Sequence, residues 1–139
     1  MTNTRTFRVK HIDIETPDTK TFHVQSIDNE VIHYESGQFL TLVSTVNGND
    51  IRRSYSLSSS PVADYLLSIT VKRVANGEMS RWLHDHIQVG DTFEALLPTG
   101  RFVLPKPFGQ VKHYFFIVAG SGIAPVFSVV QQTDRFLRI

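Results

Sequence analysis

The chain of 139 residues contains no cysteine. This absence excludes disulfide bonds, thiol catalysis and an iron–sulfur cluster held by thiolates in this chain. The charges nearly cancel, with a formal net charge of +1, so there is no electrostatic reason to expect nucleic acid or an acidic membrane as a partner. No run of about 18 uninterrupted apolar residues occurs, and we therefore expect no membrane-spanning helix. The N-terminus, Met1–Arg5, lacks the apolar core of a signal peptide, which favours a cytoplasmic location.

What is present is the composition of a globular domain, with 41% hydrophobic residues and enough length to bury a core. Apolar residues recur at every second position in six short stretches, which predicts β-strands, and at three- and four-residue spacing in one stretch, which predicts a helix. The Asn47-Gly48 pair predicts a hairpin between the third and fourth strands. The expected strands span residues 6–14, 21–27, 39–46, 53–58, 65–74 and 92–97, and the expected helix spans Glu78–Ile87. This pattern favours a mainly β protein built as a closed antiparallel barrel.

A stretch rich in proline and glycine, Pro98–Gln110, predicts a domain boundary. Beyond it the continuous apolar run Tyr114–Ala119 predicts a parallel strand that is covered on both faces. A glycine turn follows, and Pro125 stands where the first turn of a helix tolerates proline, so we expect a helix to run through Val126–Gln132. We therefore expect a barrel domain at residues 1–109 and the start of an α/β nucleotide-binding domain at residues 110–139.

The predicted fourth strand carries an unusual set of polar side chains. Arg53 and Tyr55 share one face, whereas Ser54 and Ser56 lie on the other. A strand that only fills a core would carry Val, Ile or Leu at most inward positions. A phenol ring, a guanidinium group and a hydroxyl could together hold a flat ring with a phosphate tail. The structural alternative is an edge strand with a polar outer face.

Two further stretches are suited to binding anions. The predicted helix begins at Gly77–Ser80, where free backbone amides and the helix dipole favour a phosphate, although an ordinary helix cap explains the same residues. The glycine turn Gly120–Gly122 lies between a strand and a helix, but it lacks the Gly-x-Gly-x-x-Gly spacing. The six histidines show none of the ligand spacings of known metal sites, so we expect no metal.

Four stretches, taken together and in order, resemble motifs of the ferredoxin–NADP reductase superfamily. The likeness is strongest to the reductase components of bacterial oxygenases, particularly the phenylacetate-degradation type. The matching stretches are Glu35–Phe39 (Gly-Gln-Phe turn), Arg53–Ser56 (Arg-x-Tyr-Ser), Thr70–Arg73 with Gly77–Leu83 (second flavin segment) and Ala119–Pro125 (opening of the nicotinamide-nucleotide domain). The resemblance implies a six-stranded antiparallel Greek-key barrel with one helix that binds FAD. It also implies that the barrel is followed by a single strand and helix of an NAD(P)-binding domain.

The resemblance also assigns roles to residues. Tyr55 stacks on the isoalloxazine ring, Arg53 holds the pyrophosphate, and Ser56 lies near the hydride-accepting nitrogen, so Tyr55 and Ser56 are the implied catalytic residues. The other cofactor-binding residues it implies are Ser54, Thr70, Val71, Lys72, Gly77, Glu78, Met79, Ser80 and Ser121. Gly120, Gly122 and Pro125 correspond to the NAD(P) site, which we expect to be incomplete because a full reductase continues for roughly another hundred residues.

The leading hypothesis is a flavin-dependent oxidoreductase domain. It would pass electrons from NADH or NADPH through FAD, with FMN less favoured, to an iron–sulfur or oxygenase partner. We expect weak or no turnover from this chain unless a second chain completes the nucleotide site. The alternative is a non-catalytic flavin-binding or interaction module, a truncated remnant that forms a homo-oligomer through the apolar residues of 110–139. An oligonucleotide-binding barrel is disfavoured by the near-neutral charge.

Overall fold

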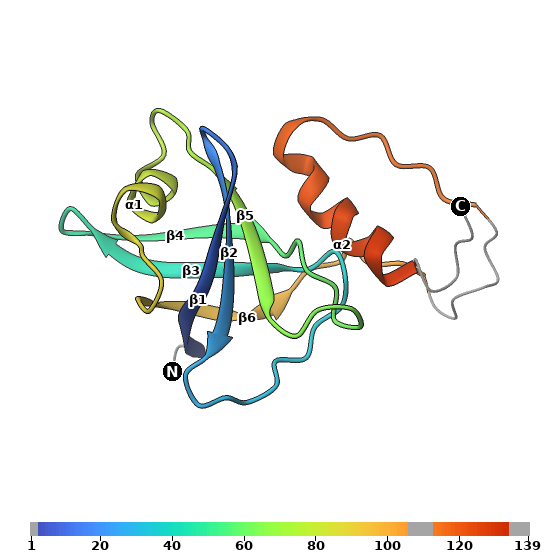
Figure 1. Ribbon diagram of the computed structural model, residues 1–139, viewed down its shortest axis with the longest axis horizontal. Helices are drawn as coiled ribbons and strands as arrows, with labels where there is room; N and C mark the ends of the chain where they lie inside the picture. Colours follow the sequence, from blue (N-terminus) through green and yellow to red (C-terminus); the bar gives the residue numbers. More distant parts are fainter. Residues whose placement is uncertain (1–2, 106–112, 134–139) are drawn as a thin grey trace.

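The computed structural model describes residues 3–105 and 113–133. Six strands form one antiparallel sheet in the order β4-β3-β6-β1-β2-β5 (Figure 1). Because β6 lies between β1 and β3, the connections cross as in a Greek key. The elements are β1 (Thr4–Thr16), β2 (Thr19–Ser26), β3 (Phe39–Val46), β4 (Asn49–Ser56), β5 (Leu67–Lys72), α1 (Glu78–His86), β6 (Thr92–Thr99), η1 (Gly120–Gly122) and α2 (Ile123–Thr133). The mainly β architecture predicted from the sequence is confirmed.

The hairpin between β3 and β4 fixes the register of the strand that carries Arg53 and Tyr55. Asn47 and Gly48 both have positive φ, 51° and 79°, which is the geometry of a two-residue type I′ turn. The turn pairs Val46 with Asn49, and the same register places Arg53 opposite Leu42 and Tyr55 opposite Leu40. The sequence prediction of this hairpin is therefore confirmed.

Only the third strand has the predicted bounds, and the first two differ by one or two residues at each end. The fourth strand begins at Asn49 and ends at Ser56, and the fifth is shorter, at Leu67–Lys72. The sixth strand continues through Pro98, which we expected to break it. Its register against β3 shifts between Phe39–Thr99 and Thr41–Leu96, so Pro98 lies in a bulge where no ladder hydrogen bond is required of it.

The predicted strand Tyr114–Ala119 is wrong. Residues 113–119 form no helix or strand, and Phe115 and Ile117 are 92% and 100% exposed. A parallel strand needs neighbours that accept and donate its backbone hydrogen bonds, and no strand of the described residues pairs with this one. In Figure 1 the segment runs as an extended trace toward the start of α2. Part of the predicted boundary, residues 106–110, lies outside the described residues.

The hydrophobic core fills the interior of the sheet and extends to α1. Phe7, Phe22, Leu40 and Leu42 are fully buried, and α1 adds Leu83 from one side. The helix predicted at Glu78–Ile87 thus forms with its apolar face inward, ending one residue earlier at His86. Neither helix of the described residues is long and apolar enough to cross a membrane.

Candidate functional site

The two edge strands of the sheet, β4 and β5, meet only at a short seam. Leu57 and Ile69 form an isolated antiparallel bridge, and the amide of Ser58 donates to the carbonyl of Ser68 at 2.8 Å. Side-chain hydroxyls reinforce this contact, because Thr70 Oγ1 donates to Ser58 Oγ at 2.9 Å and the Ser68 amide donates to Ser59 Oγ at 2.9 Å. We call Ser58, Ser59, Ser68 and Thr70 the seam. Among the described residues, this single bridge joins the two edges, and no extended β-ladder pairs β4 with β5.

Helix α1 is attached to β5 and packs against β3 and β4. His84 is buried, and its Nε2 donates to the carbonyl of Val71 at 2.8 Å. Arg73 makes two hydrogen bonds of 3.1 Å to the carboxylate of Asp85, which raises the pKa of Arg73 and lowers that of Asp85. Because α1 also contacts β4, the helix and the polar strand are neighbouring elements.

The β4 side chains that are implied to hold a flavin are only partly engaged in hydrogen bonds and packing within the protein. Arg53 is exposed, and its Nη1 donates to the carbonyl of Arg52 at 2.8 Å. Tyr55 is half-buried and packs against the core, and burial raises its pKa while the charge of Arg53 opposes that rise. Ser54 Oγ is 2.8 Å from Thr41 Oγ1 on the adjacent strand, which fits a residue that contributes mainly backbone. Ser56 is half-buried at the end of β4.

The start of α1 offers backbone amides that no side chain caps. Gly77 is the N-cap residue, and a Cβ atom there would lie 2.5 Å from Ser80 Oγ and 2.4 Å from Val74 Cγ2. Ser80 Oγ accepts a hydrogen bond from the Val74 amide and donates one to the Gly77 carbonyl, both at 3.2 Å. Ser80 and Met79 are 4% and 1% exposed, so they can reach a ligand through backbone only, whereas Glu78 is exposed.

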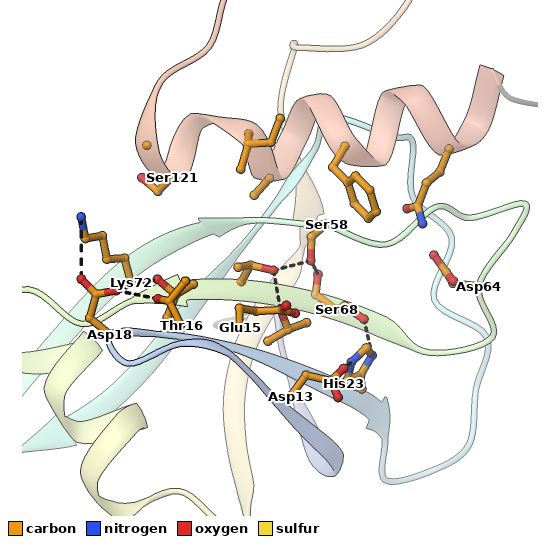
Figure 2. Close-up of a pocket in the computed structure, with 18 residues that line it drawn as sticks. Asp13, Glu15, Thr16, Asp18, His23, Ser58, Asp64, Ser68, Lys72 and Ser121 are labelled. Carbon is orange, nitrogen blue, oxygen red and sulfur yellow. Dashed lines mark hydrogen bonds and ion pairs between the residues drawn. The ribbon is translucent and has the colours of Figure 1, made fainter. Parts of the chain in front are cut away.

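Other predicted residues line a cavity of about 670 Å³ between the barrel and α2 (Figure 2). Thr70 and Lys72 contribute from β5, and Gly120 and Ser121 from the glycine turn. Lys72 is exposed and its Nζ is 3.9 Å from the carboxylate of Asp18, a loose ion pair. Apolar side chains of α2, including Phe127, form the opposite wall.

The floor of this cavity is a network of hydrogen bonds. The Thr21 hydroxyl joins the carboxylate of Glu15 to Thr70, with oxygen–oxygen distances of 2.7 and 2.8 Å. His23 lies between Asp13 and Ser68, with both contacts at 2.7 Å (Figure 2). Hydrogen bonds from His23, and then from His11, lower the pKa of Asp13. The acidic side chains here are therefore already engaged with protein donors.

The structure thus divides the predicted residues into two groups. Arg53, Tyr55 and Ser56 lie on β4, a strand that contacts α1, whereas Thr70, Lys72, Gly120 and Ser121 surround the cavity. A Cβ atom added at Gly122 would meet nothing within 4 Å, and Pro125 lies in the first turn of α2, as predicted. Val71 is buried, with its carbonyl bound by His84. Sequence reasoning missed the seam and His84, although three consecutive serines directly after the fourth strand were a visible signal.

The residues present fit FAD. A flat ring requires an aromatic surface, and Tyr55 supplies a half-buried ring with a guanidinium beside it. A pyrophosphate requires cations and amide donors, which Arg53 and the uncapped start of α1 provide. Gly77 leaves room for close approach that a Cβ atom would fill.

Comparison with known proteins decides the family. Residues 6–104 match the sequence model of the oxidoreductase FAD-binding domain family. The chain belongs to this family. A crystal structure of a cytochrome P450 reductase from Amycolatopsis is 30% identical and superposes with a TM-score of 0.82 over 96% of this chain and 40% of that one. The FAD-binding domain fold and the predicted reductase superfamily are thereby confirmed.

Curated relatives of this FAD-binding domain include reductase components of monooxygenases. The glycine betaine monooxygenase reductase subunit of Pseudomonas aeruginosa is 37% identical over 118 residues, which cover 84% of this chain and 31% of that protein. One of the subunits of the 1,2-phenylacetyl-CoA epoxidase of Escherichia coli is 33% identical over 135 residues, which cover 96% of this chain and 38% of that protein. The chain therefore spans about a third of the length of these relatives.

Proposed function

We propose that this domain binds FAD against β4 and the start of α1, and serves electron transfer from NADH or NADPH to an iron–sulfur or oxygenase partner. Bound FAD supplies a ring that accepts two electrons as a hydride and can release them singly. The observation that carries the proposal is the pairing of an exposed Arg53 guanidinium and a half-buried Tyr55 with the uncapped start of α1, on packed neighbouring elements.

Each side chain has a distinct part in this proposal. Tyr55 presents its ring to one face of the flavin, and Arg53 pairs with the pyrophosphate. Ser56 places a hydroxyl near the hydride-accepting nitrogen. The backbone of Thr70–Lys72 and the amides of Gly77–Ser80 complete the site. Gly120 and Ser121 line the cavity between the barrel and α2. Gly120 belongs to the implied nicotinamide-nucleotide site, whereas Ser121 is implied to lie near the flavin.

A titration with FAD and with FMN tests the binding step. Only FAD carries the pyrophosphate and adenosine that the start of α1 and Arg53 are proposed to hold, so FAD should bind at least tenfold more tightly than FMN. Equal affinity for the two flavins would refute the claim that Arg53 and the start of α1 hold the pyrophosphate. The variant Tyr55→Ala should weaken both flavins, because it removes the ring surface that they share.

Transfer from the nucleotide is tested by stopped-flow mixing of the FAD-loaded chain with NADH or NADPH. We predict slow or no bleaching of the flavin absorbance, because Gly120, Gly122 and Pro125 are the only described residues assigned to the nucleotide. Rapid bleaching would contradict this expectation and would establish that the chain alone completes the nucleotide site. Neither donor is preferred by the residues described.

A homo-oligomer through residues 110–139 remains a prediction. Within the described part of this stretch, Phe115, Ile117 and Phe127 expose large apolar side chains, which is typical of surfaces that associate. Light scattering at micromolar concentration should show a dimer or larger species, and a monomer would reject the prediction.

The cytoplasmic location expected from the sequence also stays a prediction.

A further inference from the structure

Three parts of the chain meet at Ser59, which lies three residues after the end of β4. Ser59 is 2% exposed. Its Oγ is 2.8 Å from the hydroxyl of Tyr34 and accepts a hydrogen bond from the Ser68 amide at 2.9 Å. Its carbonyl accepts a hydrogen bond from the hydroxyl of Ser128 at 2.5 Å. One residue therefore joins the segment before β3, the start of β5 and helix α2.

Ser128 determines how α2 sits on the barrel. It is fully buried in the middle of the helix, and a buried hydroxyl without a partner is unfavourable. A helical serine can instead bond the carbonyl four residues earlier in its own helix. Here it donates to Ser59, 69 residues away in the chain, so this placement of α2 is the one that satisfies it. Val126 and Val129 are also buried in the same helix.

The seam lies between the two groups of site residues. On one side, β4 continues back from Ser59 to Ser56 and Tyr55, and on the other side the helix that bonds Ser59 begins at the Gly120–Gly122 turn. Figure 2 shows Ser58 between α2 and β5, with its hydroxyl hydrogen-bonded to Thr70 and Ser68 of β5. Because Ser128 is bonded to Ser59, a displacement of α2 would move Ser59 and with it the point at which β4 and β5 separate.

We propose that Ser59 and Ser128 are positioning residues, and that the hydrogen bond between them couples the position of α2 to the binding of flavin between β4 and α1. This inference rests on the flavin site proposed above. Ser128 lies on α2 and is not among the residues proposed to contact the flavin, so any effect that it has on flavin affinity is indirect and passes through the seam or through Ser121, on the turn before α2. Coupling between two sites is reciprocal, so bound flavin should in turn hold α2 more firmly on the barrel.

The test compares two variants of α2. Ser128→Ala removes the hydrogen bond to Ser59, whereas Val129→Ala removes buried packing from the same helix and leaves that bond intact. We expect Ser128→Ala to weaken FAD binding about threefold to tenfold, the effect of one net hydrogen bond, and to alter the visible circular dichroism of the bound flavin. Val129→Ala should change neither. Unchanged affinity in Ser128→Ala, or an equal loss in both variants, would overturn the proposal.

Hydrogen exchange separates this inference from the flavin proposal. In the flavin-free chain, Ser128→Ala should speed the exchange of the Ser58 and Ser68 amides, which form the seam, more than Val129→Ala does. If the wild-type chain binds no FAD, the proposed function fails, and the exchange rates still decide whether Ser128 controls the seam. Equal rates in the two variants would show that it does not.

Discussion

Substituting Gly77 by alanine should perturb the start of α1 and leave the rest of the fold in place. The backbone of Gly77, at φ −90° and ψ 100°, suits alanine, so the effect must come from collisions. The new Cβ atom would lie 2.5 Å from the Ser80 hydroxyl, which is buried and makes two hydrogen bonds that hold the turn. The other collision is with Val74 Cγ2, whose exposed side chain can move away.

Loss of these two hydrogen bonds, one of which leaves a backbone amide without its partner, costs about 2–4 kcal/mol of unfolding free energy. In a domain of this size the melting temperature should fall by roughly 6–15 °C. FAD affinity should fall at least tenfold, because the backbone amides at the start of α1 would no longer be aligned to bind the pyrophosphate. A titration followed by flavin fluorescence, beside thermal melts of the flavin-free chain, measures both effects.

Gly48→Ala is the matched control for this substitution. Gly48 has φ +79° in the β3–β4 turn with nothing within 4 Å of a Cβ atom, so alanine there costs about 1 kcal/mol through backbone strain alone. It should leave FAD affinity unchanged. If Gly77→Ala lowers the melting temperature and binds FAD as the wild type does, the helix start is not the pyrophosphate site.

Three further predictions follow from other parts of the molecule. Arg53→Ala should weaken FAD binding by about tenfold to a hundredfold with little change in thermal stability, whereas the neighbouring Arg52→Ala on the opposite face should not; equal effects would refute the assignment. Burial raises the pKa of Tyr34 to about 12, so the wild type should lose stability as pH rises from about 10 toward 12, where the unfolded chain ionises first. Tyr34→Phe should lose less over that range in urea titrations, and parallel curves would refute the reasoning. Leu83→Ala, at a fully buried position of α1, should cost about 3 kcal/mol in urea unfolding, and a loss below about 1 kcal/mol would show that α1 does not pack as described.

The fold was largely predictable because its signals are local. Alternating apolar residues gave the strands, Asn47-Gly48 gave the hairpin, and the spacing of Met79, Trp82 and Leu83 gave α1. Pro98 misled the prediction, because a bulge in the pairing with β3 accommodates it. The apolar run Tyr114–Ala119 misled it too, since a strand depends on neighbours that the run itself cannot supply.

The candidate site was predictable in its chemistry and less so in its geometry. Residue types and order identified Arg53, Tyr55 and the start of α1. The Val71 carbonyl is bound by His84, 13 positions later in the chain, and no motif encodes that contact. The Ser80 hydroxyl is held within a local turn by Val74 and Gly77, a geometry that the residue types alone did not indicate. The seam likewise joins Ser59 to residues 25 and 69 positions away.

The visible absorption spectrum of the purified chain, before and after incubation with FAD, is the most direct measurement of flavin binding. We predict flavin absorption near 450 nm, a region where proteins without such a cofactor are transparent, and a higher melting temperature with FAD present. A chain that stays colourless with FAD, and melts at the same temperature with and without it, would contradict the account.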